Sequence, residues 1–459
     1  MMPRLVANCL VLLLALVSLA AACPERSAYA EDGARVRALT AWGQYAEAEA
    51  LARKVVSELE RTNTPDDSTT LSATTSLAST LSARGDYVEA EVLLRRVLTG
   101  VEDKAAKGSQ LDASGRIELS PRNEFEIIAA IDKLAAALRN QGKYPEAEAL
   151  SRRAVAEQHQ AGLCPPGAEC RPFAAMIPLS LSTHLAATLA LEGQYKEAEQ
   201  LLRRVVADLP PGHGPTGALA VVLTQQAQYT EAESLARQTL AGAERRLGPN
   251  HPQTLESIAV LAGVLDAERK YAEAEPLHRR CLAGFEREYG AEHPTVASAL
   301  SGFGLHVLRA SGPEQAEAVL ERSLAIREQR LRPGHPDIAE SLSRLGEARA
   351  ARGALREADD LLRRALTIER ESLGIDHPRV AITLTRLAVV LHARGEDAEA
   401  LRYSEQALAI QEKRLGPPHP AMADTLELQV IVLRAVGQAE QAAVAEAKAR
   451  AIREQRQSR

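Results

Sequence analysis

The chain has 459 residues, of which 46% are hydrophobic, only 3% are aromatic and 25% are charged. This composition can bury a long core, and the scarcity of aromatic side chains favours closely packed helices. The formal net charge of −6 is modest for the length. It argues against a nucleic-acid-binding surface, which needs clustered and uncompensated lysine and arginine.

The first 30 residues differ in kind from the rest of the chain. Arg4 is followed by an apolar run from Leu5 to Leu19 and then by small residues, a pattern typical of a signal peptide. The run is shorter than the roughly 20 apolar residues that a membrane span needs. The sequence therefore predicts an exported protein with its signal peptide in residues 1–30.

Two cleavage sites remain open at the end of this segment. Ala28 to Ala30, before Glu31, matches the A-x-A pattern of ordinary signal peptidase and would release a soluble protein. Ala20 to Cys23 resembles a bacterial lipobox, although Ala20 stands where a large aliphatic residue is expected. Cleavage there would leave a lipoprotein with Cys23 lipidated.

From residue 31 onward one unit recurs, and its clearest copy is His335–Asp376. The alanine of a Tyr-x-Glu-Ala-Glu signature marks each copy, and the last six of these alanines follow at intervals of 42 residues. Such a period indicates stacked helix pairs. The marker alanines are Ala48, Ala90, Ala147, Ala198, Ala232, Ala274, Ala316, Ala358, Ala400 and Ala442.

Each unit predicts two amphipathic helices joined by a glycine turn. In the clearest copy, Ile338 and Leu342 begin one apolar set at helical spacing, and a second set follows Gly353. Gly346 and Ala358 lie in columns of small residues, where two helices are expected to approach closely. Because one helix pair cannot bury its apolar stripes alone, the repeats are expected to stack.

The early repeats are less regular than the later ones. Repeat one overlaps the cleavage region, so its first helix is expected to be short or frayed. A flexible loop is expected over Asp103–Arg122 after repeat two, and a second insertion falls near 161–173. The predicted repeats are 31–61, 66–101, 124–160, 174–209 and 215–247, followed by regular repeats over 248–459.

The cysteines support different predictions. Cys164 and Cys170 are expected to form a disulfide, because export supplies an oxidising compartment and the loop between them is short. A zinc site is the alternative, with His159 as the only further ligand nearby. Cys281 takes a column otherwise held by valine or alanine, so it is expected to be a buried free thiol.

Two other recurring patterns are assigned structural roles. An acidic residue four positions before an arginine stabilises a helix by roughly 0.2–0.5 kcal/mol, and proline suits the first turn of a helix. Histidines in successive repeats are too far apart to share a metal ion. The charge pairs are Glu49–Arg53, Glu91–Arg95, Glu148–Arg152, Glu199–Arg203, Glu233–Arg237, Glu275–Arg279 and Asp359–Arg363. The His-Pro histidines are His251, His293, His335, His377 and His419.

These units resemble tetratricopeptide repeats, in particular the long repeats of kinesin light chains. The matching features are the small-residue columns, the Gly-x-Tyr-x-Glu-Ala-Glu turn, as at Gly193–Glu199, and the Leu-Gly-x-x-His-Pro linker at Leu247–Pro252. The ordinary repeat is shorter, at about 34 residues. The resemblance covers residues 31–459 and implies an all-α, right-handed solenoid of about ten repeats that binds proteins or peptides in its concave groove.

The resemblance also implies which positions face the groove. They are Ser298, Ser301, Leu305, Leu308, Glu340, Ser343, Arg344, Glu347, Ile382, Thr385, Val389 and His392. We expect Leu305, Leu308 and Val389 to provide apolar anchoring, and Arg344 and His392 to make directional contacts. The surface lacks the repeated asparagine and basic residues with which kinesin light chains hold acidic, aromatic-containing peptides, so that preference does not carry over. The two insertions are a rival binding site.

No convergent catalytic group and no catalytic, phosphate-binding or metal motif is found beside the repeats. We therefore expect no enzyme activity, no cofactor and no metal site. The predicted function is a non-enzymatic protein–protein interaction scaffold, periplasmic or secreted, that touches a membrane only through a lipid anchor. The alternatives are an outer-membrane lipoprotein of an envelope assembly or secretion complex, and a kinesin light chain-like cargo or signalling adaptor.

Overall fold

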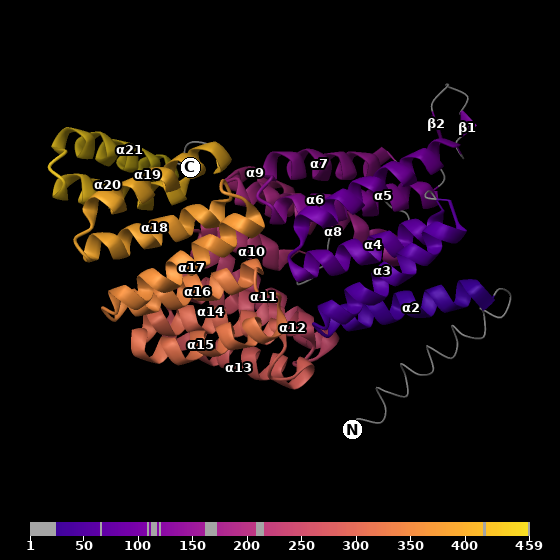
Figure 1. Cartoon of the computed structure of the whole chain (residues 1–459), viewed down its shortest axis with the longest axis horizontal. Coiled ribbons are helices and arrows are strands. Elements are labelled where there is room, and N and C mark those ends of the chain that lie inside the picture. The colour runs from indigo at the N-terminus through magenta and orange to yellow at the C-terminus, as the bar shows by residue number, and fades with distance from the viewer. Residues whose placement is uncertain are drawn as a thin grey trace. The chain divides into compact units, whose positions relative to one another are not determined.

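Helices α2 to α21 make up nearly all of the described chain, with one two-stranded antiparallel ladder, β1–β2 (Figure 1). The computed structural model describes residues 24–64, 67–107, 110–111, 117–118, 121–160, 172–207, 215–415 and 419–457. The chain divides into two compact units, Met1–Ala130 and Ile131–Arg459. The fold is all-α, as predicted, and each unit is described by itself.

The first unit contains repeats one and two. Its elements are α2 (Pro24–Ala41), α3 (Tyr45–Thr62), α4 (Ser68–Arg84), α5 (Tyr87–Lys107), β1 (Gln110–Leu111), β2 (Ile117–Glu118) and the start of α6 (Pro121–Asn140). Helix α2 is 18 residues long and buries Val36 and Leu39. Its first part, Pro24–Ala30, precedes the cleavage site after Ala30, so the expectation of a short or frayed first helix in the mature chain stays a prediction.

The segment Asp103–Arg122 also differs from the predicted loop in its described parts. Helix α5 continues to Lys107, the ladder β1–β2 follows, and α6 starts at Pro121. The continuation of α5 is stabilised by Lys104, whose ammonium donates to Ser68 Oγ at 2.6 Å and to the Glu126 carboxylate at 2.8 Å.

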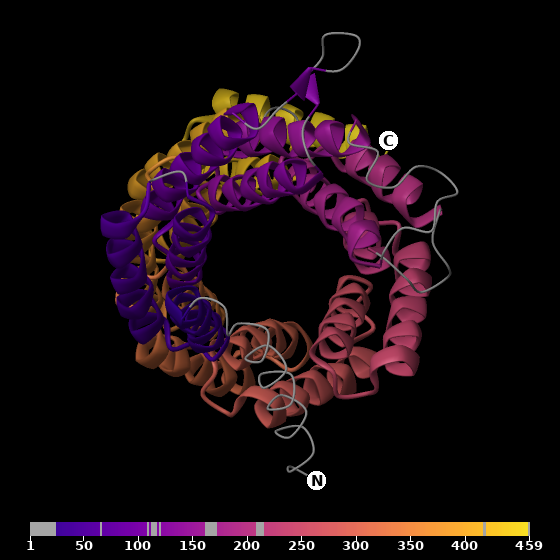
Figure 2. The same ribbon diagram turned by 90° about the vertical axis from the view of Figure 1, so that its right-hand side faces the viewer.

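The second unit completes α6 and contains the remaining repeats. Its helices are α7 (Tyr144–Gln160), α8 (Pro172–Leu191), α9 (Tyr195–Ala207), α10 (Thr216–Gln225), α11 (Tyr229–Leu247), α12 (Pro252–Ala267), α13 (Tyr271–Tyr289), α14 (Pro294–Ala310), α15 (Pro313–Arg330), α16 (Pro336–Ala351), α17 (Leu355–Leu373), α18 (Pro378–Ala393), α19 (Asp397–Leu415), α20 (Pro420–Ala435) and α21 (Ala439–Gln457). Even-numbered helices, here called A helices, open the repeats, and odd-numbered B helices close them. Figure 2 shows the helices of this unit, coloured magenta to yellow, in two layers.

The small-residue columns let the two helices of a repeat approach closely, as predicted. A Cβ added at Gly346 would lie 2.9 Å from Leu362 Cγ and 3.4 Å from the Ala358 carbonyl oxygen. Ala358 itself is fully buried. Since neither position has room for a larger side chain, the crossing of α16 and α17 depends on these residues.

The His-Pro histidines start helices, as predicted. In each of the five, Nδ1 accepts a hydrogen bond from the backbone N–H two residues later, at 3.0 to 3.2 Å. The imidazole thus serves as an N-cap of α12, α14, α16, α18 and α20. An N-cap acceptor requires a ring without a proton on Nδ1.

Two of these histidines also contact distant turns of the second unit. At Gly142, between α6 and α7, an added Cβ would lie 2.7 Å from Cδ2 of His377, and Gly193 packs in the same way against His419. Both glycines have positive φ, +70° and +76°, so glycine fits each turn on conformational and steric grounds. Repeats three and four therefore contact repeats nine and ten directly.

Candidate functional site

The predicted groove residues lie on α14, α16 and α18, the A helices of repeats seven to nine. Val389 and Ile382 are large exposed apolar residues, 48% and 47% accessible, and Ser298 is also exposed. Leu305 and Leu308 are half-buried. These five positions are accessible to a partner.

Two predicted groove residues are buried, which corrects their expected exposure. Ser301 and Ser343 are each only 2% accessible. The Ser343 hydroxyl lies 3.3 Å from Thr383 Oγ1 and accepts from Arg386 at 2.8 Å. Ser343 thus faces the neighbouring A helix α18, and its hydroxyl serves the packing between repeats. The Ser301 hydroxyl is buried without a hydrogen-bond partner among the described residues.

The charged groove positions are already paired within the chain. The guanidinium of Arg344 holds Glu340 at 2.7 Å, and Arg386 holds Glu347 at 2.7 Å. Burial alone would raise the pKa of Glu340, but Arg327 and Arg344 outweigh that effect and lower its pKa to about 2. This surface therefore offers few free charges.

The remaining predicted polar groups are paired in the same way. Nδ1 of His392 bonds the carboxylate of Asp397, and Thr385 Oγ1 donates to the Ala381 carbonyl at 3.0 Å. Of the predicted directional contacts, both Arg344 and His392 are thus occupied within the chain.

Aliphatic side chains recur at one register position of the A helices. Leu305, Val389 and Ile431 occupy equivalent places on α14, α18 and α20, and Ile431 is 52% accessible. Val221 on α10 continues the column and is also exposed. The sequence reasoning missed Ile431 and Val221, although the 42-residue step from Val389 was a signal for Ile431.

The B helices carry a different surface. All seven predicted acid–arginine pairs form, with N···O distances of 2.6 to 2.9 Å. Several arginines also reach an acidic residue in the first turn of the next B helix, which the sequence reasoning missed. These inter-repeat pairs are Arg53–Glu89, Arg152–Glu197, Arg203–Glu231, Arg237–Glu273 and Arg363–Glu399. The paired charges leave this face without an uncompensated basic stripe.

The structure tests only one of the predictions made for the cysteines. Cys281 is a buried free thiol, as predicted, and burial raises its pKa to about 12. Cys164, Cys170 and Cys23 lie outside the described residues, so the predicted disulfide and lipidation stay predictions. Among the described helices, none combines the length and apolarity required to cross a membrane.

The first unit holds a cavity of about 710 Å3 between α2, α3 and α4. Its wall includes Tyr29 and Val36 of α2, the hydroxyl side chains Ser72 and Ser76 of α4, and Lys104 of α5. The N-terminal half of α2 thus forms part of this wall.

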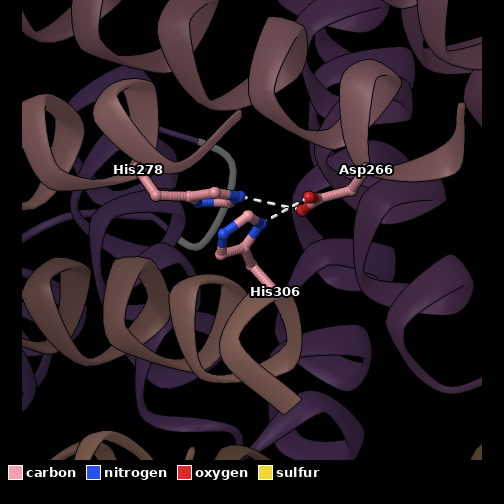
Figure 3. Close-up of side chains that lie close together, drawn as sticks. All are labelled: Asp266, His278 and His306. Carbon is pink, nitrogen blue, oxygen red and sulfur yellow. Dashed lines mark hydrogen bonds and ion pairs between the residues drawn. The ribbon is translucent and has the colours of Figure 1, made fainter. Parts of the chain in front are cut away.

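Within the described chain, one group of three side chains could hold a metal ion. Figure 3 shows the imidazoles of His278 and His306 next to each other, both directed at the carboxylate of Asp266. The N···O distances are 2.9 Å to His278 Nε2 and 2.6 Å to His306 Nδ1. The sequence reasoning missed this group because its members belong to three different helices.

Stacked A and B helices that pack chiefly on their sequence neighbours define a helical repeat protein. The tetratricopeptide repeat family matches residues 70–102, 127–160, 179–208, 215–287, 258–329, 337–413 and 380–455. The chain belongs to this family. No curated protein matches it.

Several solved structures are similar to the chain. A putative kinesin light chain with nearly identical TPR-like repeats from Podosopora anserina is 29% identical, with 43% of this chain and 93% of that chain covered and a TM-score of 0.37. BtubC (BKLC) from P. vanneervenii is 17% identical, with 63% and 92% covered and a TM-score of 0.33. A Rap protein is 12% identical, with 94% and 99% covered and a TM-score of 0.55, and shares the fold.

Proposed function

We propose that the chain is a non-enzymatic scaffold that binds a protein or peptide partner through the A helices of repeats seven to ten. The observation that carries the proposal is the set of accessible aliphatic side chains at one register position: half-buried Leu305 and exposed Val389 and Ile431. Ile382 lies on the same helix as Val389, and Glu347 takes this position in the repeat between Leu305 and Val389. Exposed apolar residues clustered on one surface favour an interaction site. The neighbouring charges are paired within the chain, so a partner would gain chiefly from apolar contact.

The partner that fits this surface is an amphipathic helix or an extended segment with two or more apolar side chains. Such a ligand can place its apolar side chains against successive repeats while its backbone runs past them. The Rap neighbour was solved in complex with Competence and Sporulation Factor. That complex shows that this fold can hold a ligand.

The binding proposal is tested by comparing two exposed apolar pairs. A photo-reactive residue at Val389 should cross-link a partner in the native envelope, and Val389→Glu with Ile431→Glu should abolish capture while helicity is retained. Val88→Glu with Val92→Glu is the matched control, because these valines are exposed on the B helix α5. Equal loss in both double variants would contradict a specific A-helix surface.

The rival hypothesis is that the partner binds to the insertions and not to the A helices. Deletion of Lys107–Gly115 removes the last residue of α5 and strand β1 but leaves the sequence of the A helices of repeats seven to ten unchanged. Were this deletion to abolish capture while the A-helix double variant still bound normally, the binding site would have to be assigned to the insertion.

We propose further that the protein is exported and acts in the periplasm or outside the cell. The signal-peptide pattern of residues 1–30 supports export. One observation favours the lipoprotein alternative: Pro24 to Ala30 form the first part of α2, and Tyr29 lines the cavity of the first unit. Cleavage after Ala30 would remove them, whereas cleavage before Cys23 leaves α2 whole. Mass spectrometry of the mature N-terminus decides between Glu31 and an acylated Cys23.

A further inference from the structure

Asp266, His278 and His306 meet where repeat six packs against repeat seven. Asp266 ends α12, His278 lies in α13 and His306 lies in α14. Their accessible fractions are 9%, 9% and 1%. Three polar side chains from three helices thus converge in a nearly closed space (Figure 3).

The repeat register shows that the scaffold does not require polar groups here. In four other repeats the position of His278 holds a fully buried leucine, and in four others the position of His306 holds a buried valine or alanine. These residues are Leu94, Leu202, Leu320 and Leu362 for His278, and Val264, Ala348, Val390 and Val432 for His306. Small hydroxyl residues, such as Ser404 and Thr188, are buried at these positions elsewhere. Two imidazoles beside a buried aspartate are thus particular to this place in the array, and burying such polar groups is unfavourable unless a partner compensates.

We propose that Asp266, His278 and His306 bind a divalent first-row transition-metal ion, with zinc the best match. Imidazole nitrogen and carboxylate oxygen are its usual ligands besides thiolate, and three protein ligands leave the fourth position of a tetrahedral ion for water. A divalent cation would compensate the buried carboxylate, and neutral imidazoles would add no further charge.

The distances are compatible with this assignment. The three candidate ligand atoms lie within 4.8 Å of one another. Bonds of about 2.0–2.1 Å at tetrahedral angles place ligand atoms about 3.3 Å apart. The present N···O distances of 2.9 and 2.6 Å therefore need to open by less than about 1 Å, while the ring protons move to the outer nitrogens.

Aromatic side chains fix the two imidazole rings. Phe303 stacks on His278 and on His306, with ring centroids 5.9 and 6.0 Å apart. Tyr271 meets His306 edge-on at 5.9 Å. Rings held in this way lose little freedom when a metal binds.

A bound ion would tie α12, α13 and α14 together. Repeats in a solenoid contact chiefly their neighbours. The bound ion would therefore stiffen one contact, that between repeat six and repeat seven. This contact lies immediately before the A helices that carry the aliphatic column. The metal site itself does not depend on the proposed partner-binding function.

Zinc titration of the full chain, produced without a histidine tag and stripped with a chelator, tests the site. The wild-type protein should bind about one equivalent, and cobalt should give the visible absorption of a tetrahedral site with nitrogen and oxygen ligands. His278→Leu and His306→Val should each weaken zinc binding at least about 100-fold. Both variants carry the residue that other repeats have, so they are expected to fold, and circular dichroism checks their helicity.

His392→Leu is the matched control, because His392 also bonds an aspartate, Asp397, but belongs to no group of three candidate ligands within the described chain. Zinc affinity should be unchanged in this variant. If the wild-type chain took up no zinc above background, or if His278→Leu and His306→Val bound it as tightly as the wild type, the metal site would be excluded. The group would then be a hydrogen-bonded Asp–His network.

Discussion

Two contacts between successive repeats of the second unit, here called joints, are built from equivalent helices but bury different side chains. The joint of α12, α13 and α14 places His278 and His306 around Asp266, whereas the joint of α16, α17 and α18 holds Leu362 and Val390 at the same register positions. All four of these equivalent side chains are buried. The 42-residue period thus determines which positions are buried. The side chains at those positions can still be polar in one joint and apolar in another.

Other equivalent positions of the two joints are alike. Arg279 and Arg363 each pair with the acid four residues earlier, and His293 and His377 cap the starts of α14 and α18. These recurring features indicate scaffold roles. Substitutions at equivalent positions can therefore separate what belongs to the repeat from what belongs to one joint.

The largest change in the free energy of unfolding is expected when a histidine is placed in the apolar joint of α16, α17 and α18. Leu362→His would bury an imidazole where Ala350 stands in place of the aspartate, so its nitrogens would lack the partner that His278 has. We expect the free energy of unfolding to fall by about 3 kcal/mol. Urea denaturation measures this loss. The reciprocal His278→Leu, in chelator-stripped protein, should cost clearly less, and equal costs would contradict the comparison.

A smaller effect is expected from the histidine at the start of α18. Burial lowers the pKa of His377 to about 3, against about 6.5 in an unfolded chain. Because the unfolded chain binds the proton more readily between these values, the free energy of unfolding falls as the pH is lowered from 6.5 towards 3. His377→Asn keeps a side-chain acceptor for the cap and does not titrate. The loss of stability between pH 7 and 4 should then be about 3 kcal/mol smaller.

Denaturation curves at pH 7 and pH 4 measure this difference, with His293→Asn as the equivalent change in the other joint. If His293→Asn changed the pH dependence of the free energy of unfolding by the same amount, the histidine cap by itself would account for the effect. An unchanged slope in His377→Asn would show that packing of His377 against the Gly142 turn does not control its protonation.

The buried serine of the second joint should contribute less. Ser343→Ala removes the hydroxyl that accepts from Arg386 and leaves that guanidinium its pair with Glu347. We expect a loss of about 1 kcal/mol, read from urea denaturation. Ser298→Ala, at an exposed position of α14, is the control and should be nearly silent. No difference between the two would mean that the Ser343 hydrogen bonds add nothing to stability.

The smallest effect is expected from the ion pairs on the B helices. Arg363→Gln breaks the pair with Asp359 at 2.8 Å and the contact with Glu399 at 3.4 Å. Such accessible pairs contribute roughly 0.2–1 kcal/mol each, and salt screens them. The loss should shrink in 1 M NaCl, and the equivalent Arg279→Gln should behave alike. A loss above about 2 kcal/mol would indicate a role beyond surface pairing.

Features that repeat along the chain were predictable from the sequence. These features include the helix pairs, the histidines that begin the A helices, the acid–arginine pairs and the buried Cys281. Each depends on residues close in sequence or on the residues at equivalent positions of other repeats. The prediction failed where neighbouring repeats decide the environment. Ser301 and Ser343 look like groove residues by register but are buried, Ser343 against an adjacent A helix, and the pairing of Arg344 and His392 is equally hidden from a single repeat.

The sequence by itself determined the repeat count, the helix pairing and the positions of the small residues, because each depends on periodicity and local propensity. Only the tertiary structure placed the Gly142 turn against His377 and brought Asp266, His278 and His306 together. For the Gly142 turn, the physical reason is that contacts between distant repeats depend on small rotations that add up from repeat to repeat. For the three side chains, it is that their meeting depends on how three neighbouring helices are rotated about their axes, which the spacing of residues does not give. A period in the sequence specifies the neighbours of each helix but not that accumulated rotation.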